Sequence, residues 1–168
     1  MIRHIDEEAI DVATVPLTTA DLTAIEADGY RVIRPASWPL PTVQEGDSVL
    51  LAGYPADWRS AASWHEHDFA AVTQGLIVQS RHDLEFIAHR DPTYLTSMTA
   101  PLEEMRQLGV GGCSGGPVFL VRQTPILAPQ LCGIVKQGVK PVQDAEDILF
   151  RFARLDCLLR EDGSVQRP

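Results

Sequence analysis

Short runs of β-branched and other apolar residues recur along this chain, with turn-forming residues between them. Twelve glycines and twelve prolines among the 168 residues supply these breaks. Several short strands separated by turn signals indicate an all-β sandwich or barrel rather than a helical bundle. The runs that predict strands are Ile10–Leu17, Tyr30–Pro35, Ser48–Tyr54, Phe69–Ser80, Leu84–His89, Tyr94–Met98, Pro117–Arg122 and Leu131–Val139.

The last part of the chain has a different period. Between Ile148 and Leu159 the apolar residues recur at helical spacing, and Asp156 with Arg160 adds a favourable pair one turn apart. This pattern predicts one amphipathic helix over Ile148–Leu159. The expected fold class is therefore all-β, an antiparallel barrel with a C-terminal α-helix.

Composition excludes several functions. A formal charge of −9 disfavours nucleic acid as a partner, because an acidic surface repels phosphate backbones. No apolar run reaches the ~18 residues of a spanning helix, so no membrane partner is expected. The three cysteines form no CxxC pair, which argues against a disulfide framework and a zinc site. Residues 1–20 carry no secretory pattern, so a cytoplasmic location is expected. Neither a metal ion nor a cofactor is expected.

The most informative segment for function is Leu108–Val118, LGVGGCSGGPV, in which five of eleven residues are glycine and a single hydroxyl lies near the centre. Glycines on both sides of Ser114 permit positive φ angles and close approach of a substrate. They also allow successive backbone N–H groups to point into one concavity, which stabilises an oxyanion. The alternative is a tight glycine-rich hairpin with an incidental serine.

The run Gly112-Cys113-Ser114-Gly115-Gly116-Pro117 resembles the G-x-S-G-G-P signature of trypsin-like serine peptidases, which have the chymotrypsin fold. The resemblance implies that Ser114 is the nucleophile and that the N–H groups of Gly112 and Ser114 form the oxyanion hole. Three weaker matches occur in the family's order: Ile10–Leu17, Gly46–Pro55 and Gly133–Gly138.

These matches imply further roles. Asp11 would be the triad acid, although Asp6, Glu7 and Glu8 are nearby alternatives. Substrate would pair with the backbone of the strand that contains Ile134, Val135, Lys136 and Gln137. Residues 1–45 would be a remnant of the first barrel with its connection. Residues 46–168 would be the complete second barrel with its helix.

The resemblance lacks one catalytic group. Acyl transfer by a serine needs a base, and the family's histidine lies several tens of residues before the aspartate, whereas only ten residues precede Asp11. The chain is then either part of a longer peptidase or a natural remnant. The five histidines are His4, His65, His67, His82 and His89, and the last four lie where the family has no triad member. The run at residues 65–68, HEHD, lacks a third metal ligand at helical spacing, which favours an exposed loop.

Three residues depart from the family or set its specificity. Cys113 replaces an acid used in zymogen activation; it is either a buried packing residue or itself a nucleophile. Lys136 replaces a small residue and is expected either to pair with Asp11 or to point to solvent. Leu108, six residues before the serine, would form the floor of the specificity pocket and favour an apolar or small residue before the cleaved bond.

Two functions follow from the sequence. The first is a trypsin-like serine endopeptidase with a polypeptide substrate, for which this chain alone is expected to show little or no hydrolysis. The second is a non-catalytic peptidase-like domain that binds a peptide by strand addition. We also expect Val12, Val15 and Leu17 to be exposed and to promote self-association.

Overall fold

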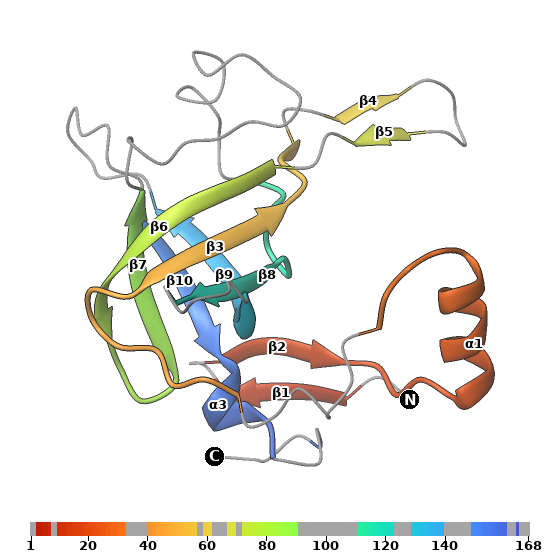
Figure 1. The fold of residues 1–168 in the computed structure, drawn as a ribbon, viewed down its shortest axis with the longest axis horizontal. Helices are drawn as coiled ribbons and strands as arrows, with labels where there is room; N and C mark the ends of the chain where they lie inside the picture. The colour runs from red at the N-terminus through yellow and green to blue at the C-terminus, as the bar shows by residue number, and fades with distance from the viewer. Residues whose placement is uncertain are drawn as a thin grey trace.

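The computed structural model of the chain describes residues 3–7, 10–32, 40–56, 59–61, 67–69, 72–90, 111–122, 129–139, 149–160 and 164 (Figure 1). Its main feature is a closed barrel of six antiparallel strands in the order β10-β7-β6-β3-β8-β9. The strands are β3 (Ser48–Gly53), β6 (Val72–Arg81), β7 (Glu85–Arg90), β8 (Pro117–Val121), β9 (Gln130–Val139) and β10 (Leu149–Arg154). The predicted mostly-β class and antiparallel barrel are confirmed.

The strand connections follow a Greek-key pattern. Strands β3, β6 and β7 are consecutive neighbours, and β8 returns to pair with the opposite edge of β3. A fourth strand beside the first, in the spatial order 4-1-2-3, defines this motif. The barrel then closes because β10 pairs with both β7 and β9.

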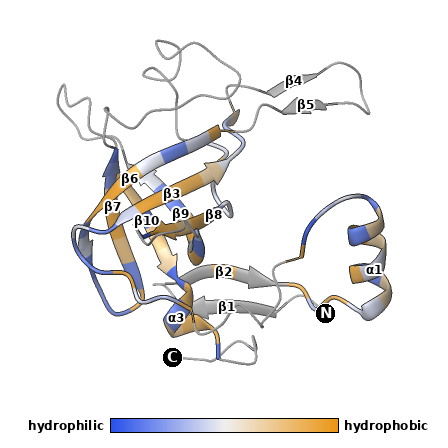
Figure 2. Cartoon of the chain, viewed as in Figure 1, coloured by the Kyte–Doolittle hydropathy of each residue, from blue (hydrophilic) through white to orange (hydrophobic). Residues whose placement is uncertain are grey.

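Alternation along the strands explains the barrel interior. Burial in β6 and β7 alternates residue by residue, as expected when one face is packed and the other is not. Figure 2 shows the resulting mixture of apolar and polar residues along the strands. Three phenylalanines fill the centre: the ring centroid of Phe152 lies 4.9 Å from that of Phe86 and 6.0 Å from that of Phe150.

The C-terminal helix is shorter than the sequence predicts. Residues Leu149–Arg154 form strand β10, and only Leu155–Leu158 form helix α3. The apolar residues of this segment fit a strand as well as a helix, since Phe150 and Phe152 alternate into the barrel. Pairing with strands on both sides selects the strand, because it satisfies the backbone groups of this buried segment.

The N-terminal part forms a separate two-stranded sheet of β1 (Arg3–Glu7) and β2 (Ile10–Thr14). Val12 is buried against Ala153 of β10 and Leu158 of α3. The expectation that Val12 is exposed was therefore wrong. Val15 and Leu17 are exposed, as expected. Self-association through them stays a prediction.

Helix α1 (Thr19–Ala27) has no counterpart in the sequence prediction. Its N-terminus has a reciprocal capping box, in which the Thr18 hydroxyl accepts from the Asp21 N–H and the Asp21 carboxylate accepts from the Thr18 N–H. None of its residues is buried. Local capping rather than packing therefore defines this helix.

Some expected strands differ in extent or cannot be assessed. The segment predicted as a loop after Tyr54 contains a short hairpin, β4 (Arg59–Ala61) with β5 (His67–Phe69). Residues 30–32 are not in a strand, whereas residues 33–35 and the run Tyr94–Met98 lie outside the described residues.

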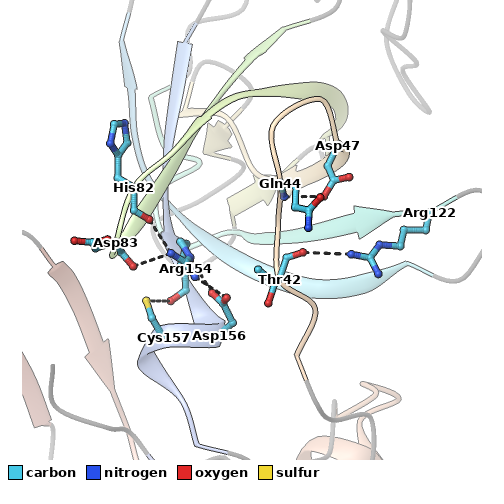
Figure 3. A network of polar contacts seen from close by, with 9 residues as sticks. All are labelled: Thr42, Gln44, Asp47, His82, Asp83, Arg122, Arg154, Asp156 and Cys157. Atoms are coloured by element: carbon cyan, nitrogen blue, oxygen red, sulfur yellow. Dashed lines mark hydrogen bonds and ion pairs between the residues drawn. The ribbon is translucent and has the colours of Figure 1, made fainter.

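A buried arginine ties the end of β10 to the turn between β6 and β7 (Figure 3). Arg154 Nη1 donates to the carbonyl oxygens of His82 and Asp83, at 2.7 and 2.9 Å. Its other nitrogens bind the carboxylate of Asp156 in a bidentate pair, at 3.0 and 2.7 Å. Hydrogen bonding to Asp156 raises the pKa of Arg154, against the effect of burial. These bonds of Arg154, called the clamp below, hold together the end of the barrel that lies opposite the glycine-rich turn at residues 111–116.

Candidate functional site

The glycine-rich turn, residues 111–116, is anchored at both ends to different strands. The carbonyl oxygen of Gly111 accepts from the N–H of Ala56, 2.7 Å away, just after β3. The N–H of Gly115 donates to the carbonyl of Val135 in β9, and the N–H of Val135 donates to the carbonyl of Gly116, both at 2.9 Å. The turn, which directly precedes β8, is thus hydrogen-bonded at its start to the segment after β3 and at its end to β9.

Two glycines of this turn cannot carry a side chain. Gly112 has a φ of +91°, and a Cβ there would lie 2.6 Å from the nitrogen of Ala56. A Cβ on Gly116 would lie less than 2.5 Å from the carbonyl oxygen of Ala52. Gly112 therefore needs glycine both for its positive φ and for its close packing, and Gly116 needs it for packing alone.

Ser114 is exposed at the tip of this turn. Its hydroxyl donates to the carbonyl oxygen of Lys136, 3.3 Å away. Within the described part of the chain, the backbone N–H groups of Gly112 and Ser114 donate to no protein acceptor. Both predicted oxyanion donors thus belong to the same turn as an exposed hydroxyl.

An open cavity of about 420 Å³ adjoins the turn. Its described lining residues come from the turn and the start of β8, from the end of β3 with the residue after it, and from the start of β6: Ala52, Gly53, Tyr54, Val72, Thr73, Gly112, Cys113, Ser114, Gly115, Gly116 and Pro117. The hydroxyl predicted as nucleophile therefore lies beside a concave surface rather than on a flat one.

Cys113 belongs to the barrel core. It is buried, and its sulfur would lie 3.1 Å from a Cβ added to Gly53. Of the two alternatives from the sequence, packing fits this position and a nucleophilic role does not. All three cysteines lie in the described part of the chain, and no disulfide joins them.

Lys136 lies at an irregularity of β9. Gln137 pairs with Arg151 and Val135 pairs with Phe152, so Lys136 is the extra residue of a β-bulge. Such a bulge redirects the backbone locally, here bringing the Lys136 carbonyl to Ser114.

The side chain of Lys136 does not point to solvent. Its Nζ lies 3.1 Å from Oε2 of Glu85, and the other oxygen of Glu85 accepts from Arg151. Burial alone would raise the pKa of Glu85, but hydrogen bonds and charges from Arg151 and Lys136 outweigh it and lower the pKa. Pairing of Lys136 with Asp11 stays a prediction, because the Asp11 side chain lies outside the described residues.

The predicted substrate-binding residues occupy different environments. Ile134 packs against the cluster that contains Val12, and Val135 is buried with strand or turn partners on both sides. Gln137 is exposed. Strand β8 begins opposite Ile134, so among the described strands the part of β9 from Gln137 to Val139 pairs only with β10.

None of the remaining predicted groups is among the described residues that line the cavity. Asp11 lies in β2 opposite Asp6. Leu108 and His65 lie outside the described residues. His4 is in β1 and His67 in β5, while His89 is in β7.

His82 lies in the β6–β7 turn, with Nε2 3.4 Å from the hydroxyl of Ser80. No histidine is among the described residues that line the cavity. Among the described residues, no group of three or more potential metal ligands occurs, and no helix is long and apolar enough to cross a membrane.

Sequence reasoning missed the wall of the cavity and the partner of Lys136. Tyr54, directly after β3, and Val72 and Thr73 of β6 line the site, far from Ser114 in sequence. Glu85 was read only as part of a strand. No motif marks these residues, because only the closure of the barrel brings them to the turn.

Comparisons with protein-family models, with curated proteins and with solved structures each find no match for this chain.

Proposed function

We propose that this chain is the nucleophile-bearing barrel of a trypsin-like serine endopeptidase. The observation that carries the proposal is the exposed Ser114 hydroxyl beside a cavity, on a glycine turn in which the N–H groups of Gly112 and Ser114 donate to no acceptor among the described residues. A Greek-key antiparallel barrel is consistent with the chymotrypsin-like fold that the G-x-S-G-G-P motif implies.

The chemistry assigns one task to each group. Ser114 Oγ attacks the peptide carbonyl carbon, and the N–H groups of Gly112 and Ser114 hold the resulting oxyanion. The peptide C–N bond then breaks, the amine leaves with the proton taken from Ser114, and water hydrolyses the acyl ester. The proton transfer needs a base, and Asp11 in the predicted role orients such a base rather than replacing it. Hydrolysis by the chain alone is therefore expected to be very slow.

A fluorophosphonate probe tests this proposal directly. In the longest natural form of the protein, the probe should label Ser114, and the S114A variant should remain unlabelled. The S48A variant is the matched control, since Ser48 is an exposed serine at the far end of β3. Labelling that is absent in the native protein, or equal in S114A, contradicts the proposal.

A non-catalytic peptide-binding domain is the second candidate. It is favoured by the absence of histidine among the described cavity residues and by the ion pair that fixes Lys136. An extended peptide would then add to β9 along Gln137–Val139, where β8 no longer pairs. This candidate predicts that peptide binding persists in S114A, while probe labelling of Ser114 is absent in the unmodified protein.

A further inference from the structure

The turn that carries Ser114 separates two surfaces. On one side lies β9, reached by the hydrogen bonds of Gly115 and Gly116 to Val135 and of Ser114 to Lys136. On the other side lie the ends of β3 and β6, which form the far wall of the cavity. A peptide that pairs with β9 and crosses Ser114 must therefore continue toward β3 and β6.

The described part of the cavity wall is electrically neutral. None of the described lining residues is an acid, a lysine, an arginine or a histidine. Moving a charged side chain into such a site without a partner is costly, whereas an apolar side chain gains free energy by leaving water. The wall thus selects against charge.

The wall also offers apolar and aromatic contact. Val72 and Ala52 contribute from β6 and β3, and the ring of Tyr54 remains half-exposed beside them. Aromatic side chains supply large contact areas at binding surfaces. The volume of about 420 Å³ lies within the range of about 300–1,000 Å³ usual for small-ligand pockets.

We infer that this cavity binds an uncharged apolar side chain, of leucine or phenylalanine size, from the peptide residue on the leaving-group side of Ser114. The inference rests on the proposed function only for the direction in which the peptide runs. The chemical class of the occupant rests on the wall itself. The cavity then determines specificity on the side of the scissile bond opposite the β9 edge.

Amino-acid amides are suitable probes because they reproduce the amine released by cleavage. In an NMR titration of the chain, leucinamide and phenylalaninamide should shift the backbone amides of Gly53, Thr73 and Gly112. Glycinamide, lysinamide and glutamic acid α-amide should bind at least about tenfold more weakly. Equal affinity for leucinamide and glycinamide, or shifts confined to other parts of the barrel, would overturn the inference.

Two variants and a control locate the binding. T73L places a larger side chain in the cavity and should abolish the leucinamide shifts, whereas S48L adds the same side chain at the exposed end of β3 and should preserve them. If T73L fails to fold, Y54A serves instead and should weaken phenylalaninamide more than leucinamide. Unchanged shifts in either folded variant contradict the assignment.

Loss of this site and loss of the proposed activity can be told apart. The S114A variant should still bind leucinamide while losing probe labelling. Leucinamide binding in a protein whose Ser114 is never labelled would leave the apolar class of the occupant standing, and would refute the peptidase together with the leaving-group side of the assignment. Labelling of Ser114 without leucinamide binding would do the reverse.

Discussion

The hydroxyl of Ser114 lies 3.3 Å from the backbone carbonyl oxygen of Lys136, to which it donates a hydrogen bond. The two residues belong to a turn and to a bulge of β9, so the geometry of the hydroxyl depends on both. The bulge is in turn fixed through the Lys136 side chain, which reaches Glu85 on β7. A chain of contacts therefore runs from the outer face of the barrel to the proposed nucleophile.

Replacing Gly112 by alanine should destabilise the protein by about 2–4 kcal/mol, because it combines an unfavourable positive φ with a backbone clash against Ala56. Urea unfolding measures the loss. The control is G111A, since nothing lies within 4 Å of a Cβ at Gly111 and its φ is not in the positive range. Comparable losses in both variants would show that close packing of Gly112 is not the cause.

The Glu85 carboxylate should make stability depend on acid pH. Its pKa is lowered in the folded protein, so its contribution is present above the ordinary carboxyl pKa and is lost as pH falls through the folded value. At neutral pH, E85Q should cost about 1–3 kcal/mol, since two cations lose a charged acceptor. Unfolding measured from pH 7 downwards should show the two proteins converging at acid pH.

Arg154 should be among the most sensitive charged residues. R154A removes a buried cation, leaving the Asp156 carboxylate and the carbonyls of His82 and Asp83 without these bonds, at a cost of about 3–5 kcal/mol. R122A is the control, because among the described residues exposed Arg122 makes a single 3.3 Å bond, to the Thr42 carbonyl, and its loss should change stability by less than about 0.5 kcal/mol. Thermal unfolding of both variants compares them; similar losses would contradict the clamp.

The cysteines should differ in their reaction with iodoacetamide. Burial raises the pKa of Cys132 to about 12, so at pH 8 almost none is thiolate. Cys157 is only partly buried and, although burial also raises its pKa, it should react first. Mass spectrometry after a short pulse should find modification at Cys157, with Cys113 and Cys132 modified only after unfolding in urea. Rapid native modification of Cys132 would contradict its burial.

The barrel strands could be predicted because their signal is local. Alternating apolar residues and flanking turns marked the runs around Val49, Leu76, Phe86 and Leu120 with boundaries close to those observed. The helix predicted around Phe150 was wrong because the spacing of leucine and phenylalanine there fits both the helical and the strand period. Only pairing with β7 and β9 decides between the two. The helix after Thr18 was missed because its stability comes from a capping box rather than from an apolar face.

The candidate site likewise has a part that local sequence predicts and a part that depends on long-range contacts. The turn around Ser114 was identifiable because two pairs of glycines flank it closely in sequence, and one glycine of each pair, Gly112 and Gly115, has a positive φ. Tyr54, Thr73 and Glu85 reach the site only through long-range pairing, so no spacing in the sequence indicates them. The ion pair of Lys136 could not be predicted for the same reason, because its acceptor, Glu85, lies on β7, two strands away from β9 in the barrel.

All six barrel strands lie between Ser48 and Arg154, and neither β1 nor β2, which precede this stretch, contributes to the barrel. Ahead of Ser48, Val43 packs in the barrel core and Gly46 and Asp47 bond to Val78, whereas Val12 packs outside the barrel against Ala153 and Leu158. Exchange of the segment before Val43 would therefore leave every strand pair of the barrel in place. The turn around Ser114 would then keep its bonds to Ala56 and Val135.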